Sequence, residues 1–107
     1  MVDDPNANNG LITKIWGPPL WTSLHAITFG YPIKPTQKQK DEYKQYFIDT
    51  KNVLPCKYCR DSYEGFLTNK GEEDTWLTDK DLESRETLTK WFVRVHNRVN
   101  KKLDVDY

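Results

Sequence analysis

The feature that most constrains the fold of this chain of 107 residues is a helical repeat of apolar side chains near its C-terminus. The repeat keeps a spacing of three or four residues and consists of Leu88, Trp91, Phe92, Val95, Val99 and Leu103. This spacing gives an α-helix one apolar stripe, and such a stripe has to be buried against another element. No segment alternates apolar and polar residues over the length of a strand. The sequence therefore predicts an all-α fold.

Proline, glycine and a capping threonine mark three further helices. The first is expected to open at residues 17–19 (Gly-Pro-Pro) and to end at residues 30–32 (Gly-Tyr-Pro). Thr36 is expected to cap a second helix, and a third is expected to run from Pro55 to the Asn-Lys-Gly of residues 69–71. Four helices joined by short links predict a four-helix bundle.

Length and charge limit the classes of function. The chain is long enough for one domain, which is expected over residues 16–107 and preceded by a flexible segment at residues 1–15. Its 16 Lys and Arg residues balance 16 Asp and Glu residues, so its net charge does not favour nucleic acid or a membrane surface. The sequence has no apolar run of about 20 residues and no signal or transit pattern at its N-terminus. We therefore expect a cytoplasmic protein that binds neither nucleic acid nor membranes.

The only two cysteines of the chain, Cys56 and Cys59, form a Cys-x-x-Cys pair directly after Pro55. Two thiols at this spacing can close into a disulfide. If Pro55 lies in the first turn of a helix, the N–H groups and the dipole of that turn stabilise a thiolate. In a cytosolic protein a lasting disulfide is usually catalytic or sensing. The pair is therefore predicted to be redox-active.

A structural zinc site is the alternative explanation for the cysteine pair. It would need His25 and His96 as further ligands, because such sites have about four. The order of these four residues matches no zinc-finger spacing, but a non-enzymatic helical module holding zinc remains an alternative. A thioredoxin motif would need a preceding strand, and none precedes Pro55.

Two pairs of residues one helical turn apart could hold a flat heterocycle. Trp21 and His25 form one pair, and His96 and Asn100 form the other. A ring that stacks and a ring that hydrogen-bonds suit an adenine or an isoalloxazine. The alternative for the second pair is a core histidine with a satisfied hydrogen bond and a solvated asparagine.

Three sequence blocks, in order, resemble the FAD-linked sulfhydryl oxidases of the Erv/ALR family. They are Trp-Gly-Pro-Pro-Leu-Trp-Thr-Ser-Leu-His at residues 16–25, Pro-Cys-Lys-Tyr-Cys-Arg at residues 55–60, and His-Asn-Arg-Val-Asn-Lys-Lys-Leu at residues 96–103. The combination is specific although no single block is. The first block is most similar to members from large DNA viruses and from the quiescin branch.

The resemblance implies a compact helical bundle, usually homodimeric, with FAD bound at its mouth. It implies an enzyme that oxidises a dithiol protein substrate or a thioredoxin-like shuttle and passes the electrons through FAD to O₂, giving H₂O₂. Cys56 would exchange with the substrate and Cys59 would face the flavin. The implied cofactor-binding residues are Trp16, Gly17, Trp21, His25, Tyr63, His96, Asn97, Val99, Asn100 and Lys102. No metal is implied, and the compartment would be the cytoplasm of a cell or of an infected host.

The chain departs from the family pattern at several points. Pro18 stands where an arginine commonly follows the glycine of the first block. After Cys59, where family members often have Arg-x-His-Phe, it has Arg-Asp-Ser-Tyr, so the histidine is replaced by Ser62. After Leu103, the common Gly-Lys becomes Asp104 and Val105, which weakens the assignment of a phosphate contact there. A second, shuttling cysteine pair is missing, so we expect either a partner protein or a longer natural chain. Besides the oxidase and the zinc-binding module, a third possible function is that of a disulfide carrier without flavin.

Overall fold

The computed structural model describes residues 13–55, 57–67 and 75–107. Its elements, in order, are α1 (Thr13–Phe29), α2 (Gln37–Asp49), the 3₁₀ helix η1 (Thr50–Asn52), α3 (Lys57–Leu67) and α4 (Arg85–Leu103). The described residues contain no strand. The prediction of an all-α fold with four helices is therefore confirmed.

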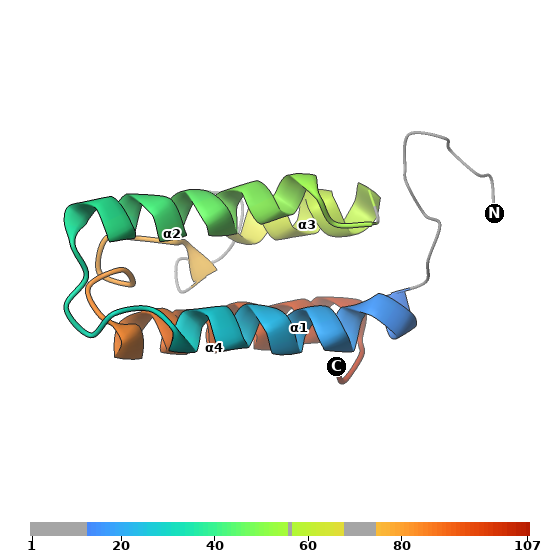
Figure 1. The fold of residues 1–107 in the computed structure, drawn as a ribbon. Helices are drawn as coiled ribbons and strands as arrows, with labels where there is room; N and C mark the ends of the chain where they lie inside the picture. The colour runs from blue at the N-terminus through green and yellow to red at the C-terminus, as the bar shows by residue number, and fades with distance from the viewer. Residues whose placement is uncertain (1–12, 56, 68–74) are drawn as a thin grey trace.

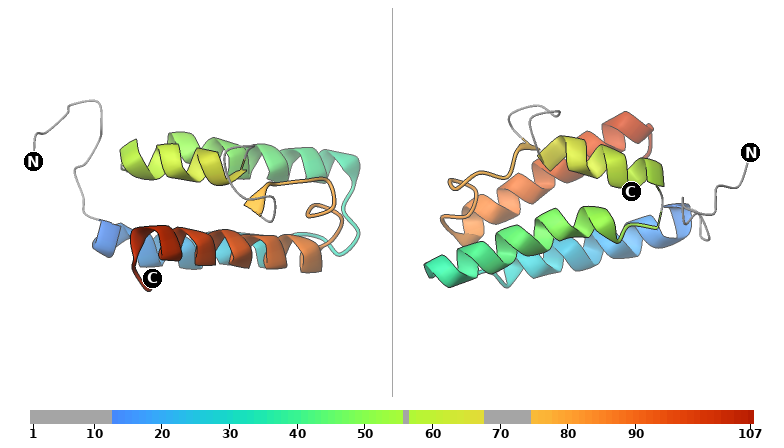
Figure 2. Two further views of the ribbon diagram at one scale, coloured as in Figure 1. Left: turned by 180° about the vertical axis from the view of Figure 1, so that it is seen from behind. Right: turned by 90° about the horizontal axis from the view of Figure 1, so that it is seen from above.

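The four α-helices form two layers. Figures 1 and 2 show α1 and α4 side by side in one layer, running in opposite directions, with α2 and α3 in the other. As a result, the start of α1, the 3₁₀ helix η1, the start of α3 and the end of α4 all lie at the same end of the bundle (Figure 1). This is the end at which the sequence motifs meet, and we call it the mouth.

Helix α1 begins earlier than the sequence predicted. It starts at Thr13 instead of Gly17, so Pro18 and Pro19 lie inside the helix. Proline has no N–H, so the carbonyls of Lys14 and Ile15, four residues before, lose their helical partners. Both residues are exposed in the first turn, where water can replace those bonds. Two prolines are therefore tolerated near this helix start, and the expected flexible segment loses residues 13–15 to α1.

The other helix ends follow from capping chemistry. Thr36 caps α2 as predicted, in a box with Gln39. Ser84 and Thr87 form a second capping box at the start of α4, which the sequence analysis did not identify. Both boxes satisfy N–H groups that a helix start leaves without a partner. The described part of α3 begins at Lys57, and its expected end at residues 69–71 lies outside the described residues.

The core is built mainly from large rings and leucines. Its buried members are Leu24, Tyr31, Phe47, Leu54, Tyr63, Leu67, Leu77, Leu82, Leu88, Trp91, Phe92 and Val95. The apolar stripe of α4 lies at its centre, because Leu88, Trp91, Phe92 and Val95 are fully buried. Phe47 from α2 packs edge-on against Trp91 with ring centroids 5.4 Å apart. Burial of the stripe thus joins the two layers, as its helical period predicted.

Candidate functional site

A pocket opens at the mouth of the bundle, between α1, α3, α4 and the segment after α2. Its walls enclose about 610 Å³ of space, which includes solvent at the opening. The lining residues are Trp16, Gly17, Leu20, Trp21, Leu24, Thr50, Leu54, Cys59, Ser62, Tyr63, Val99, Lys102 and Tyr107. Most of the wall is apolar or aromatic, which suits a flat ring system. We call this cavity the mouth pocket.

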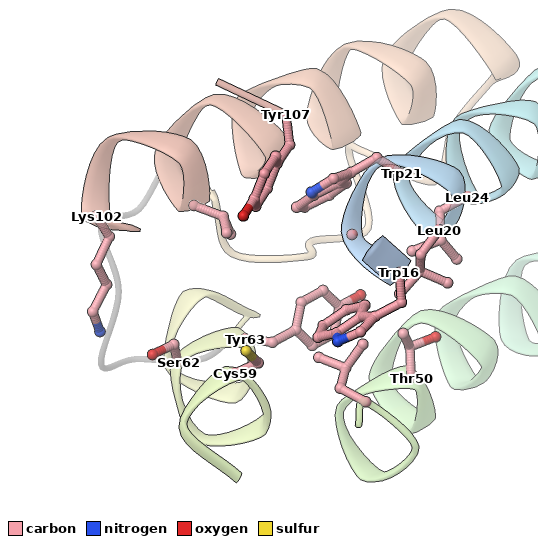
Figure 3. Close-up of a pocket in the computed structure, with 13 residues that line it drawn as sticks. Trp16, Leu20, Trp21, Leu24, Thr50, Cys59, Ser62, Tyr63, Lys102 and Tyr107 are labelled. Atoms are coloured by element: carbon pink, nitrogen blue, oxygen red, sulfur yellow. The ribbon is translucent and has the colours of Figure 1, made fainter. Parts of the chain in front are cut away.

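Cys59 forms part of the pocket wall. It is half-buried on α3, and Figure 3 shows its sulfur on the wall that also holds Tyr63 and Trp16. Cys59 is the third residue of α3, within the first turn, where unpaired N–H groups favour a thiolate. Its predicted partner, Cys56, lies outside the described residues.

Tyr63 is fixed beside Cys59 by a buried hydrogen bond. Its hydroxyl donates to the main-chain oxygen of Phe47 at 2.9 Å. Burial, with a smaller contribution from Tyr46, raises the pKa of Tyr63 well above its ordinary value. The phenol therefore stays protonated and keeps donating, which holds the ring in place against the pocket.

An aromatic cluster from α1 and α4 lies beside the pocket. The rings of Trp21 and His96 are stacked, with centroids 4.0 Å apart and planes inclined by 11°. His25 Nε2 and His96 Nδ1 are 2.8 Å apart, so one of these nitrogens donates a hydrogen bond to the other. Phe92 meets His25 edge-on at 4.7 Å. The i, i+4 pair on α1 and the i, i+4 pair on α4 are thus brought together.

Both histidines favour the neutral form. Burial lowers the pKa of His25 below its ordinary 6.5, and the charge of His96 lowers it further. Burial also lowers the pKa of His96, although the main chain of Tyr107 and the carboxylate of Asp106 act in the opposite direction. A neutral pair needs only one proton between the two facing nitrogens, which matches their short separation.

Two buried polar atoms in this cluster have no hydrogen-bond partner among the described residues. They are His96 Nε2 and Asn100 Oδ1, one turn apart on α4. The main chain of Tyr107 lies close enough to His96 to raise its pKa. It does not meet the geometry of a hydrogen bond to His96 Nε2. Buried polar atoms normally find partners, and leaving one unpaired costs about 1–3 kcal/mol. Such an edge fits a ligand with its own donors and acceptors.

The chain belongs to the Erv1/Alr family. The family model matches residues 18–107, which include α1 from Pro18, the cysteine pair and all of α4. The resemblance drawn from the three sequence blocks is therefore confirmed.

Individual relatives agree with this placement. The chain is 46% identical to a probable FAD-linked sulfhydryl oxidase of Acanthamoeba polyphaga mimivirus, over 79% of this chain and 56% of the relative. It is 36% identical to the mitochondrial FAD-linked sulfhydryl oxidase ERV1 of Saccharomyces cerevisiae, over 78% of this chain and 40% of the relative. The crystal structure of the FAD-binding domain of that yeast protein matches with a TM-score of 0.76 and 32% identity, covering 90% of this chain and 84% of the other. The chain spans about half the length of these curated relatives.

The mouth pocket gathers most of the site residues predicted for an Erv1/Alr protein. Seven of them line it: Trp16, Gly17, Trp21, Cys59, Tyr63, Val99 and Lys102. Three more, His25, His96 and Asn100, form the adjoining cluster. Asn97 is exposed and lies outside the lining, because it is one residue, or about 100°, around α4 from His96. Its role stays a prediction.

Six further residues line the pocket without having been predicted from the sequence: Leu20, Leu24, Thr50, Leu54, Ser62 and Tyr107. Leu20 and Leu24 follow Trp16 at intervals of four, so the helical period of α1 could have identified them. Tyr107 reaches the pocket because the chain reverses after α4. Asp104 has a left-handed backbone with φ of 54°. The N–H groups of Asp104 and Val105 both donate to the main-chain oxygen of Asn100. Figure 3 shows the resulting position of Tyr107 beside Trp21.

The zinc alternative finds no support. Among the described residues no group of three or more histidine, cysteine, aspartate or glutamate side chains is placed to hold a metal ion. The facing nitrogens of His25 and His96 are engaged with each other.

None of the described helices is long and apolar enough to cross a membrane.

Proposed function

We propose that this Erv1/Alr chain is an FAD-dependent thiol oxidase that forms disulfides in a dithiol substrate. The observation that supports this most directly is the shared pocket. Cys59 lines the same cavity as Trp21, and the stacked His96 next to it carries one of two buried polar atoms without a partner. A redox thiol and the ring of Trp21 thus line one cavity, and the unpaired polar edge lies in the adjoining cluster, in a fold that matches the FAD-binding domain of yeast Erv1.

The protein's own residues would first exchange thiols with the substrate. A substrate thiolate attacks the Cys56 sulfur of the Cys56–Cys59 disulfide, forming a mixed disulfide and releasing Cys59 as a thiolate. The second substrate thiol then attacks the mixed disulfide, which yields the substrate disulfide and the Cys56 thiol. The first turn of α3 makes Cys59 a good leaving group, because its N–H groups stabilise the negative charge.

FAD, when bound, would accept the two electrons of the reduced cysteine pair and transfer them to O₂, giving H₂O₂. Trp21 and Tyr63 would contact its rings, and the unpaired atoms of His96 and Asn100 would bond its polar edge. Lys102, at the opening of the pocket (Figure 3), is a candidate partner for phosphate. The neutral state of the histidines suits this task, because a neutral ring can accept as well as donate a hydrogen bond.

The partners and the compartment are part of the same proposal. The substrate would be a dithiol protein or a thioredoxin-like shuttle, and O₂ would be the final acceptor. We also propose a homodimer: Tyr46 and Val53, exposed by 45% and 76%, lie in a groove between α1 and the end of α2 that offers an apolar face for it. We also propose a cytoplasmic location, although one relative is mitochondrial.

The deciding experiment compares the visible spectrum and O₂ consumption of the purified chain with those of Cys59→Ser. We expect a yellow protein that consumes O₂ with dithiothreitol, and a yellow Cys59→Ser variant that consumes none. Cys56→Ser should also stop turnover, but should add a long-wavelength charge-transfer band from the Cys59 thiolate beside flavin. Colourless protein would contradict the proposal. A charge-transfer band in Cys59→Ser instead would reverse the roles of the two sulfurs.

A further inference from the structure

The start of α3 is tied to the chain before it by one specific hydrogen bond. Arg60 Nη1 donates to the main-chain oxygen of Leu54 at 2.8 Å. Arg60 directly follows Cys59, and Leu54 is two residues before Cys56. The bond therefore spans the cysteine pair from outside. Leu54 is itself buried and lines the mouth pocket, so the segment held by Arg60 is part of the pocket wall.

Helix geometry explains why an arginine can make this bond. Side chains on a helix lean toward its N-terminus, and Arg60 is the fourth residue of α3. Its long side chain can therefore reach back past the helix start to a carbonyl six residues earlier. The guanidinium is always charged, so the bond is charge-assisted and stronger than one between neutral groups.

A second link lies one turn away and provides a comparison. Lys51 Nζ, from η1, is 3.4 Å from Glu64 Oε1 on α3. This link is longer and more exposed, with 49% of the Glu64 side chain accessible, and exposed ion pairs contribute little to stability. Both links join α3 to the chain that follows α2, but of the two only the Arg60 bond ends at the main chain, at Leu54, two residues before Cys56.

The contribution of the Arg60 bond should depend on the redox state of the cysteines. In the oxidised protein a disulfide would link Cys56 covalently to Cys59 on α3. In the reduced protein that covalent link is gone, and non-covalent contacts set how often one thiol meets the other. We infer that Arg60 is a positioning residue that keeps the segment of Leu54 on α3 in the reduced state, and so raises the effective concentration of one thiol at the other. The inference rests on the redox role proposed above for the two cysteines.

A measurable consequence concerns the equilibrium between dithiol and disulfide. A higher effective concentration favours the disulfide and lowers the reduction potential of the pair. Losing the bond in Arg60→Met should decrease the equilibrium constant for disulfide formation about tenfold, given the usual strength of charge-assisted bonds. For a two-electron couple, a tenfold change corresponds to about 30 mV. The variant's disulfide should be easier to reduce.

The experiment equilibrates the FAD-bound protein anaerobically in glutathione buffers of known potential. In each buffer, reduction converts the protein disulfide to two thiols while two glutathione molecules become one glutathione disulfide. The free thiols are then alkylated and the oxidised fraction is measured by mass. Arg60→Met tests the bond, Arg60→Lys keeps the charge with a single donor group, and Lys51→Met is the matched control in the exposed link. Melting temperatures are recorded for the oxidised and reduced forms of each protein.

We expect a shift of about 30 mV to higher potential in Arg60→Met, a smaller shift in Arg60→Lys and no shift in Lys51→Met. The oxidised form of Arg60→Met should also lose more thermal stability than its reduced form, because a less favourable disulfide in the folded protein means that the oxidised fold is destabilised more. A merely structural role would lower both forms equally, and that result would overturn the inference. Equal potentials in Arg60→Met and Lys51→Met would do the same.

Two further outcomes separate this inference from the proposed function. If Arg60→Met does not fold, the potential of Arg60→Lys decides, and an unchanged value rejects the positioning role. If the wild-type pair never forms a disulfide in any buffer, the proposed function fails and the inference fails with it. Normal oxidase activity with unchanged potentials in the Arg60 variants would reject only the inference.

Discussion

Among the described residues, the buried side-chain atoms without a hydrogen-bond partner all lie toward one end of the bundle. At the end away from the mouth, the Tyr31 hydroxyl donates to the main-chain oxygen of Leu82 at 2.6 Å. Arg85 Nε donates to the main-chain oxygen of Tyr31 at 2.7 Å. At the mouth, His96 Nε2 and Asn100 Oδ1 are buried without partners. We call the end away from the mouth the closed end. A protein that only needed stability would satisfy the buried polar groups at both ends, so we propose that the closed end provides stability and that the mouth binds the ligand.

The closed end is organised around the segment before α4. Asp81 is buried there and accepts hydrogen bonds from the main-chain N–H and the hydroxyl of Thr78, both at 2.9 Å. Its second oxygen accepts from Arg94 Nη2 at 3.0 Å. The Trp91 indole donates to the Thr75 oxygen at 3.0 Å. These bonds hold a segment without regular structure against α4, and none of them involves a residue of the mouth pocket.

The largest effect on folding is expected from Asp81→Ala. The change removes three hydrogen bonds, two from Thr78 and one from Arg94. We expect a loss of about 2 kcal/mol in the free energy of unfolding, below the full value for a buried ion pair because Arg94 is partly exposed. Urea denaturation measures the loss, and FAD affinity should not change in the folded protein.

Glu86→Ala is the matched control for Asp81→Ala. Glu86 pairs with Lys90 at 2.8 Å on the same helix, but both side chains are exposed, so its loss should change stability far less. If Asp81→Ala weakened FAD binding and left stability intact, the assignment of separate tasks to the two ends would be wrong.

A smaller effect is expected from Asn100→Leu, which should keep or raise the stability of the FAD-free protein but lower its affinity for FAD. The change replaces a buried, unpaired oxygen with an apolar group of similar size, which removes the cost of burying it. Without FAD, the free energy of unfolding should stay the same or rise by about 1 kcal/mol. FAD affinity should fall about tenfold, since the cofactor loses a hydrogen bond at the site. Thermal denaturation of the FAD-free protein and fluorescence titration with FAD measure the two quantities.

Asn97→Leu tests the neighbouring asparagine in the same assay. Its side chain is exposed and outside the pocket lining, so neither stability nor FAD affinity should change much. An equal loss of FAD affinity in both variants would mean that Asn97 also contributes to FAD binding. It would contradict the inference that the unpaired oxygen of Asn100 distinguishes the two residues.

The sequence predicted the closed end and the mouth unequally well. The stripe of α4 identified the core because burial follows helical period directly, as the complete burial of Leu88 and Val95 illustrates. The Ser84 capping box was not predicted because its N3 residue is Thr87 and not the usual Glu or Gln. The start of α1 was misplaced because proline usually marks a first turn, whereas here exposed carbonyls allow it further inside the helix.

At the mouth, motifs on α1, α3 and α4 identified residues whose types are unusual, such as Trp21, His25 and His96. They could not identify Thr50, Leu54 or Tyr107, which reach the pocket through chain reversals and not through a local pattern. The bond from Arg60 to Leu54 likewise depends on how the segment of Leu54 lies relative to α3. Helical period predicts faces, whereas the position of a turn relative to a helix end is a tertiary property.

The smallest expected effect is a dependence of stability on pH that arises at the mouth alone. His25 and His96 are the only histidines of the chain, and burial lowers the pKa of both below the ordinary 6.5. The folded protein therefore binds fewer protons than the unfolded chain once the pH falls below about 6.5. Stability of the FAD-free protein should be complete above that pH and should decline as the pH falls toward the lowered values. Asp106 should limit the decline, because its carboxylate favours the charged form of His96.

Melting temperatures between pH 8 and pH 5.5 check this, with His25→Gln and His96→Gln combined as the variant that cannot titrate. The slope below pH 6.5 should disappear in the double variant and should remain in Asp81→Ala, whose change lies at the closed end. Bound FAD should raise the melting temperature throughout this pH range, because a cofactor that binds only the folded protein adds stability. A slope that persists in the double variant would mean that other groups titrate, and the histidine pair would then not distinguish the mouth from the closed end.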